Sequence, residues 1–260
     1  MELGKRLRKC RVVSTDDIED MIGKSSRKIT FSAVRQCLLA DNLPDEYRSA
    51  IQKNVYDILR VEHNLKDYYD ILSDHYKYNP KRVNIGDMER NFFQRVRNTL
   101  SNIVDFKIYF PKEKDNLFVY VDEERLEYAI LELIFNALHH AEVEPDKQRK
   151  ISIWISRAGK KMRFSVGDNG MGMEDEEIAH CCEPGFSMAE DKNSLGLGLC
   201  LVRFFAEACH GKLEITSEKR KGTTIKLSVP RAEEEKLPGV ASATTKEIQY
   251  PDPVNVMLGM

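Results

Sequence analysis

The sequence predicts an α+β protein in which an α-helical hairpin precedes a two-layer α/β sandwich. Two observations carry this prediction. Apolar residues recur at helical spacing in the N-terminal part of the chain, whereas Ile151–Ile155 and Met162–Val166 alternate apolar and polar residues, as strands do. This alternation indicates a sheet with one covered face, and helices such as the apolar Tyr128–Leu138 supply the cover.

The N-terminal region, Thr15–Tyr76, reads as two helices separated by the loop Asp41–Asp45. Pro44 fits the first turn of the second helix, where a missing N–H costs no helical hydrogen bond. The second helix carries an apolar seam with Glu62 at a skipped position, and the first helix carries a rougher stripe. The seam residues are Ile51, Val55, Ile58, Leu65, Tyr69 and Leu72, and the stripe residues are Ile18, Ile22, Ile29, Val34 and Leu38. One hairpin cannot bury both, so residues 1–78 are predicted to form a dimerisation domain in which two hairpins pair into a four-helix bundle.

The sandwich is predicted to span residues 84–230, after a linker at Asn79–Arg82. The expected helices are Ile85–Asn102, Glu123–Ala141 and Leu199–Cys209, and the further expected strands are Phe106–Phe110, Phe118–Val121, Lys212–Thr216 and Thr224–Val229. Residues 231–260 are rich in Glu, Ala, Thr and Pro, a composition that predicts a mobile C-terminal tail.

Composition excludes several classes of protein. The net charge is −2 and the acidic and basic residues are intermingled along the 260 residues, so we expect no nucleic-acid surface. No apolar run approaches the roughly 18 residues that a membrane span needs, and the N-terminus lacks the apolar region of a signal peptide. The six cysteines form no C-x-x-C pair and hence no zinc signature. We therefore expect a cytoplasmic protein without membrane insertion.

Two polar residues stand out in the apolar helix before the central strands. Glu132 and Asn136 are one helical turn apart, so both side chains leave the same face of the helix. An amide oxygen is a ligand for Mg²⁺, a hard cation that keeps several waters while it bridges phosphates. A carboxylate beside it can accept a proton from an attacking water or hydroxyl.

Two glycine-rich turns follow this helix, Asp168-Asn169-Gly170-Met171-Gly172 and Leu195-Gly196-Leu197-Gly198-Leu199. Alone, an Asp-Asn-Gly sequence is commonly a β-turn, because Asn and Gly tolerate a positive φ. The first turn also offers a carboxylate acceptor, and its glycines let the backbone approach a flat ligand. The second turn precedes a helix, where unpaired N–H groups and the helix dipole favour phosphate.

In this order the motifs resemble those of the Bergerat-fold ATPases, and most closely the catalytic domain of sensor histidine kinases. The resemblance covers about Asn84–Pro230, more than half of the chain. Leu131–Ala141 resembles the N box, Asp168–Gly172 the G1 box, Cys182–Ser187 a degenerate F box, Gly196–Leu199 the G2 box and Gly222–Thr224 the terminal GT element. The helical hairpin likewise resembles the dimerisation domain of these kinases.

This resemblance implies ATP and Mg²⁺ as cofactors and assigns roles to particular residues. Asn136 is the implied magnesium ligand, Glu132 the catalytic base and Asp168 the acceptor for the adenine amine, supported by the hydroxyl of Thr223. His140 lies against the nucleotide, and His139 replaces a phosphate-contacting lysine, a weaker phosphate partner when neutral. The other implied cofactor-binding residues are Gly170, Gly172, Gly196, Leu197, Gly198 and Leu199. A lid over about residues 179–194 offers Lys192 as a candidate for the γ-phosphate.

One family feature is missing, because the phosphoacceptor histidine is not where the resemblance requires it. The first helix of the hairpin contains no histidine, and the first one in the chain is His63, on the second helix and without the expected flanking residues. We expect His63 to be an ordinary bundle or surface residue. Autophosphorylation by the usual route is then not expected.

The sequence leaves two readings of function open. The first is a homodimeric, histidine-kinase-like signal-transduction protein that acts on a partner, such as a response-regulator receiver domain or a partner kinase. The alternative is a catalytically silent, nucleotide-binding regulatory module or phosphotransferase-like adaptor for a receiver-like partner. Under the first reading ATP is transferred to the partner or slowly hydrolysed, and under the second it is only bound.

Overall fold

The computed structural model describes residues 45–101, 103–140, 148–187 and 195–232. The first predicted helix of the hairpin, Lys192 and residues 233–260 of the predicted tail lie outside the described residues. Among the described residues, no helix is both long enough and apolar enough to span a bilayer.

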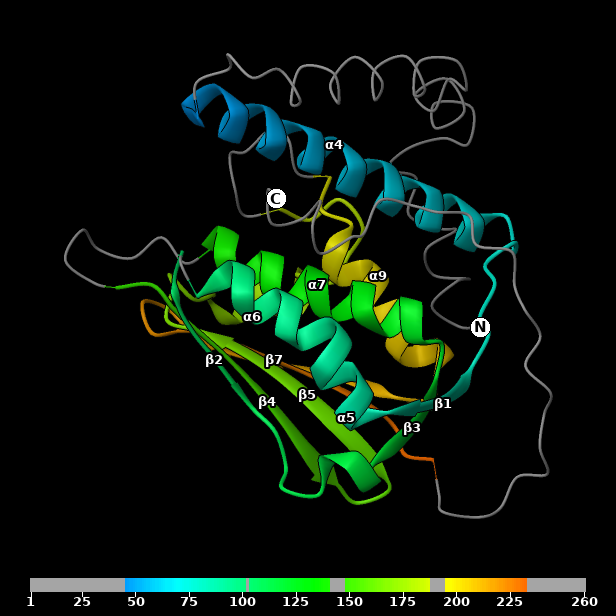
Figure 1. Cartoon of the computed structure of the whole chain (residues 1–260). Coiled ribbons are helices and arrows are strands. Elements are labelled where there is room, and N and C mark those ends of the chain that lie inside the picture. The colour runs from blue at the N-terminus through cyan, green and yellow to red at the C-terminus, as the bar shows by residue number, and fades with distance from the viewer. Residues whose placement is uncertain (1–44, 102, 141–147, 188–194, 233–260) are drawn as a thin grey trace.

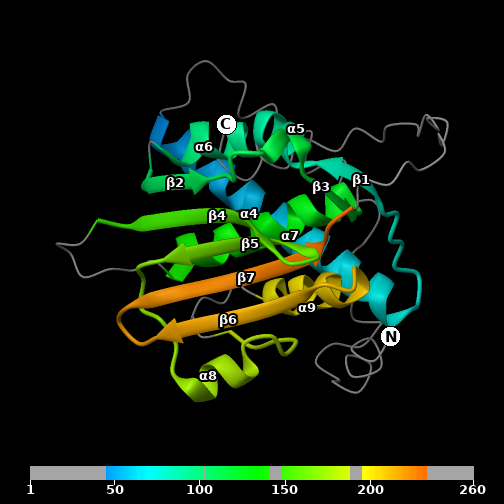
Figure 2. The same cartoon turned by 90° about the horizontal axis from the view of Figure 1, so that it is seen from below.

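A five-stranded sheet forms one layer of the molecule. Its strands run in the order β2 (Asp105–Tyr109), β4 (Lys150–Ala158), β5 (Lys161–Asp168), β7 (Gly222–Pro230) and β6 (Lys212–Glu218). Only β2 and β4 pair in parallel, and every other neighbouring pair is antiparallel. Figure 2 looks onto the sheet, with the helices behind it.

Helices form the second layer and cover one face of the sheet (Figure 1). They are α7 (Glu123–His140), α9 (Gly198–Ala208) and a helix built from α5 (Ile85–Met88), a π-helical turn (Glu89–Phe93) and α6 (Gln94–Leu100). The smaller elements are the antiparallel pair β1 (Lys81–Asn84) and β3 (Phe118–Val121), a 3-10 turn (Lys114–Asn116) and α8 (Asp175–His180).

The alternation along β4 explains why the two layers pack. Ile151, Ile153 and Ile155 are buried beneath the helices, whereas Trp154 between them is 42% exposed and stacks on Tyr109 of the neighbouring strand. The apolar side chains lie on the face that the helices cover, so packing the helices onto that face removes their surface from water, while the other face stays exposed. The predicted two-layer α/β sandwich is thereby confirmed.

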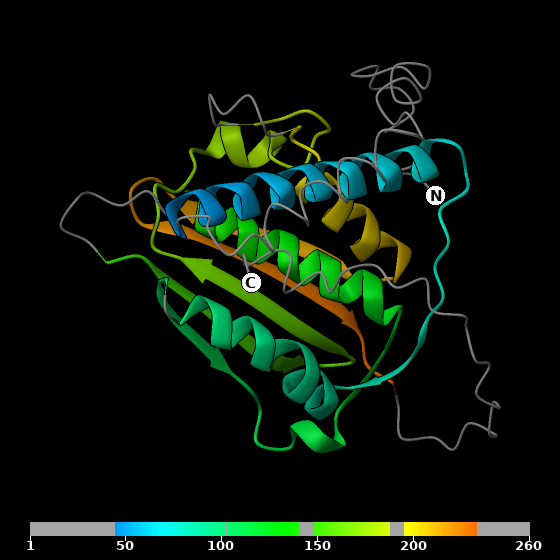
Figure 3. The same cartoon turned by 45° about the horizontal axis from the view of Figure 1, so that its top comes forward.

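The long helix α4 (Asp45–Leu72) crosses over α7 and α9, as Figure 3 shows. Leu65, Tyr68 and Ile71 are buried in one cluster with Leu197 and Cys200, at the start of α9. The C-terminal half of α4 therefore packs within the chain.

This packing changes the reading of the predicted seam on α4. Leu65 is 4% exposed because it lies against α9, whereas Ile58 is 56% exposed. The sequence predicts that a second hairpin buries this seam, whereas the described C-terminal turns of α4 pack against the start of α9 in the same chain. Dimerisation stays a prediction, with Ile58 as the described seam residue that is open to a partner.

Candidate functional site

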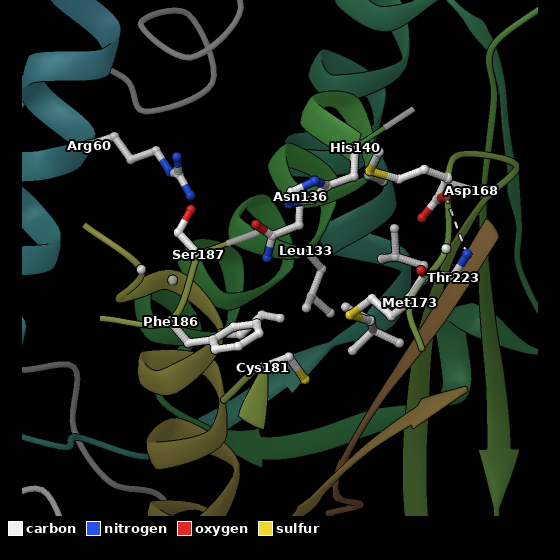
Figure 4. A pocket seen from close by; sticks show the side chains of 18 residues that line it. Arg60, Leu133, Asn136, His140, Asp168, Met173, Cys181, Phe186, Ser187 and Thr223 are labelled. Carbon is white, nitrogen blue, oxygen red and sulfur yellow. Dashed lines mark hydrogen bonds between the residues drawn. The ribbon is translucent and has the colours of Figure 1, made fainter. Parts of the chain in front are cut away.

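A pocket lies between α7, the two glycine-rich turns and the ends of β5 and β7. Eight of the residues predicted for the cofactor site line it: Asn136, His140, Asp168, Gly172, Gly196, Gly198, Leu199 and Thr223. In Figure 4, Asp168 and Arg60 lie at opposite ends, with Asn136 and His140 between them. Met173, Cys181 and Phe186 add an apolar wall.

Four of the predicted residues do not line this pocket. Gly170 donates its N–H to Asp168 Oδ1, and Leu197 packs against α4 in the apolar cluster. The His139 ring stacks on Phe135 at a centroid distance of 6.0 Å. Glu132 is 6% exposed and lines a second, smaller cavity under α4 instead.

Asp168 is held by backbone donors at one of its oxygens. Its Oδ1 accepts the N–H of Gly170 at 2.8 Å and the N–H of Thr223 at 3.3 Å. Burial raises the pKa of the Asp168 carboxyl, and the two backbone donors oppose that rise. Thr223 thus supports Asp168 through its N–H; the hydroxyl expected in that role pairs with the Ser217 hydroxyl at 2.8 Å.

The glycine-rich turns need glycine for steric reasons. Gly172 has φ of +63°, and a Cβ there would clash with the carbonyl oxygen of Glu218. Gly196 has φ of +62°, with the backbone of Phe186 too close for a side chain. Helix α9 starts at Gly198 with no side-chain cap from the described residue Leu197, and Gly198 and Leu199 in its first turn line the pocket.

Asn136 presents its amide to the pocket (Figure 4). Its amide nitrogen is buried and has no hydrogen-bond partner within the described part of the chain. A buried polar group without a partner is costly, so the amide is a candidate ligand contact. Burial, helped by His139 and Arg60, lowers the pKa of the neighbouring His140 and favours its neutral form.

Glu132 forms an ion pair with Arg60, which belongs to α4. Arg60 Nε lies 2.8 Å from Oε1 and Nη2 lies 2.7 Å from Oε2, a two-pronged contact. Asn64 adds a bond to Oε1 at 3.2 Å, and the Arg60 guanidinium sits 3.4 Å from the Phe135 ring centroid. Sequence reasoning missed Arg60, since nothing local indicates that α4 docks here. The sequence signals that bear on a phosphate-binding cation are the weak partner His139 and the lid residue Lys192, which lies outside the described residues.

His63 lies between α4 and α7. Its ring stacks on Tyr128 at a centroid distance of 3.8 Å, and Nε2 is 3.5 Å from Asp67 Oδ2. Burial lowers the pKa of His63, while the charge of Asp67 opposes the shift. Asp67 in turn pairs with Arg125 of α7. His63 therefore packs between two helices of the same chain, and the expectation that it is not a phosphoacceptor stays a prediction.

Comparison with known proteins assigns the domain. Residues 121–233 match the family described as histidine kinase-, DNA gyrase B- and HSP90-like ATPases. The chain is 29% identical over 158 residues to the phosphate regulon sensor protein PhoR of Haemophilus influenzae, covering 59% of this chain and 34% of that protein. It is 31% identical over 140 residues to sporulation kinase B of Bacillus subtilis, covering 52% of this chain and 32% of that protein. The chain thus spans about a third of the length of these curated relatives.

A solved structure shares the fold. Histidine kinase AdeS of Acinetobacter baumannii superposes with a TM-score of 0.54 at 14% identity, over 82% of this chain and 97% of that one. The match to this ATPase family covers less than half of the chain, and the two relatives are a sensor protein and a kinase. The predicted resemblance to the histidine kinase-type ATPase domain is confirmed.

Proposed function

We propose that the protein binds ATP with Mg²⁺ in this pocket and acts on a signalling partner, such as a response-regulator receiver domain or a partner kinase. The observation that supports this most directly is the position of Asp168. Its Oδ1 is taken by two backbone donors, so Oδ2 is left to accept the adenine amine. Guanine carries a carbonyl oxygen at that place and would be repelled.

The residues at the other end of the pocket fit a magnesium-bound triphosphate. Asn136 lies between that end and Asp168; its amide nitrogen has no partner among the described residues and can donate to a phosphate oxygen, while its amide oxygen suits Mg²⁺, which prefers oxygen ligands and keeps several waters. No group of three or more His, Cys, Asp or Glu within the described ranges is arranged for a metal, so Asn136 would hold the ion together with phosphates and water. When bound, the ion neutralises phosphate charge. The start of α9 at Gly198 supplies N–H donors to the same phosphates.

Glu132 is the proposed general base. It lies one helical turn from Asn136, and its Oε2 adjoins Gly198 at the start of α9, so it is the carboxylate that would accept a proton from a water or hydroxyl at the phosphates. In the observed arrangement both carboxylate oxygens are engaged by Arg60, so base action requires that this ion pair open.

The ion pair also favours the second reading, a nucleotide-binding regulatory module. If Arg60 keeps both oxygens of Glu132 engaged, the protein would bind ATP without hydrolysing or transferring it. In either case we propose a cytoplasmic homodimer, with the exposed Ile58 on α4 at the contact between hairpins.

Incubation of the full chain with γ-labelled ATP·Mg²⁺, with and without a purified receiver domain, separates the readings. Label on the receiver supports the kinase, and label released as inorganic phosphate supports hydrolysis. Bound but unreacted ATP supports the regulatory module. Asp168→Asn is the control, because it should lower receiver labelling, phosphate release and ATP binding together. A parent protein that binds no ATP would overturn all of these readings.

A further inference from the structure

The ion pair between Arg60 and Glu132 borders the phosphate end of the pocket. A methyl group added at Gly198 would clash with Glu132 Oε2 and lie 3.2 Å from Arg60 Nη2. Both charged groups therefore adjoin the first residue of α9, whose N-terminus favours phosphate. Arg60 itself lines the pocket, at the end away from Asp168 (Figure 4).

Among the described residues that line the pocket, Arg60 is the only lysine or arginine. His139 stands where the family resemblance places a phosphate-contacting lysine, and its ring is turned onto Phe135. His140 lines the pocket, but burial lowers its pKa and keeps it neutral. Arg60 carries a permanent charge and a planar fork that matches phosphate oxygens as well as carboxylate oxygens.

We propose that Arg60 is shared between Glu132 and the terminal phosphate of bound ATP, so that ATP draws Arg60 away from Glu132. This inference rests on the proposed function, because it takes Asp168 to hold the adenine and thereby places the terminal phosphate at the Arg60 end. ADP, which lacks that phosphate, does not reach Arg60. Arg60 is therefore the residue that distinguishes ATP from ADP.

The same exchange connects the nucleotide to the position of α4. Arg60 and Asn64 are the α4 side chains that bind Glu132, so the ion pair is one of the contacts that hold α4 on α7. If ATP competes for Arg60, it weakens this contact and exposes Glu132 for proton transfer. Thermodynamic linkage makes this coupling reciprocal. The factor by which ATP weakens the Arg60–Glu132 contact equals the factor by which opening that contact changes ATP affinity.

The test measures ATP·Mg²⁺ and ADP·Mg²⁺ affinities of the full chain by calorimetry. Arg60→Gln should weaken ATP binding about tenfold or more, the effect of losing one hydrogen bond to a charged group, and leave ADP binding within about twofold. Arg60→Lys should restore part of the difference. Glu132→Gln should tighten ATP binding by removing the competing charge, and this gain should vanish in the Arg60→Gln background.

Arg125→Gln is the matched control. Arg125 also joins α7 to α4, through Asp67, but it lines the second cavity and not the nucleotide pocket. The substitution removes the contact with Asp67 but leaves the Arg60–Glu132 ion pair in place, so the ratio of ATP to ADP affinity should not change. Equal loss of ATP and ADP binding in Arg60→Gln, or the same ratio change in Arg125→Gln, would reduce Arg60 to a structural role and overturn the inference. If the parent binds ATP in an Asp168-dependent way but Arg60→Gln leaves the ratio of ATP to ADP affinity unchanged, this inference alone is refuted. If the parent does not bind ATP, the proposed function is refuted.

Discussion

Replacing Asp168 by Asn tests the adenine assignment, because the structure fixes the direction of the effect. Two backbone N–H groups, from Gly170 and Thr223, point at Oδ1. In Asp168→Asn these donors require the amide oxygen at that position, so the amide nitrogen must take the place of Oδ2. A donor would then face the adenine amine, itself a donor.

The expected cost is the loss of one hydrogen bond plus one unsatisfied buried donor, about 1–3 kcal/mol. This corresponds to roughly 5- to 150-fold weaker ATP binding. Because the substitution keeps the shape of the side chain and both backbone bonds, thermal unfolding should change little. GTP should lose less affinity than ATP, because the new donor suits the guanine carbonyl.

Isothermal titration with ATP·Mg²⁺ and GTP·Mg²⁺ measures both effects. Asn169→Asp is a matched control at the next position. Asn169 bonds to Lys150 and Gln148 outside the pocket, so its substitution should leave ATP affinity unchanged. Unchanged ATP binding in Asp168→Asn, or an equal loss in Asn169→Asp, would refute the assignment of Asp168.

Three further predictions concern the metal, the dimer and pH. Asn136→Ala should remove the magnesium dependence of ATP affinity measured with and without chelator; a parent titration insensitive to Mg²⁺ would contradict the ligand role. Ile58→Asp should convert a dimer to a monomer in light scattering without lowering thermal stability, because Ile58 is 56% exposed, and a parent that is already monomeric at high concentration would reject the bundle. Burial lowers the pKa of His63 below its usual value of 6.5, so the folded state favours the neutral imidazole. The stability that neutral His63 contributes is fully present above about pH 6.5 and is lost as the pH falls through the folded pKa. Denaturant titrations at pH 7.5 and 5.5 should show a smaller acid loss in His63→Gln than in the parent, and equal losses would argue against it.

The sequence by itself determined the sandwich and most of the pocket, because the signals there are local. The alternation of buried Ile151, Ile153 and Ile155 fixes which face of β4 is covered. Gly172 and Gly196 adopt a positive φ, which few other residues tolerate, so their turns were readable from residue type alone. Asn136 leaves α7 toward the pocket because of helical geometry.

Only the tertiary structure decided what surrounds Glu132. One helical turn from Asn136, it was predicted to share the pocket, yet it is bound by Arg60, a residue 72 positions earlier in the chain. Neither helix encodes that contact on its own. Leu65, Tyr68 and Ile71 pack against the apolar start of α9. Their burial positions α4 over α7 and so places Arg60 beside Glu132. A hydrophobic contact is not directional, so the pattern on α4 predicted that the seam would be buried but could not say against which partner.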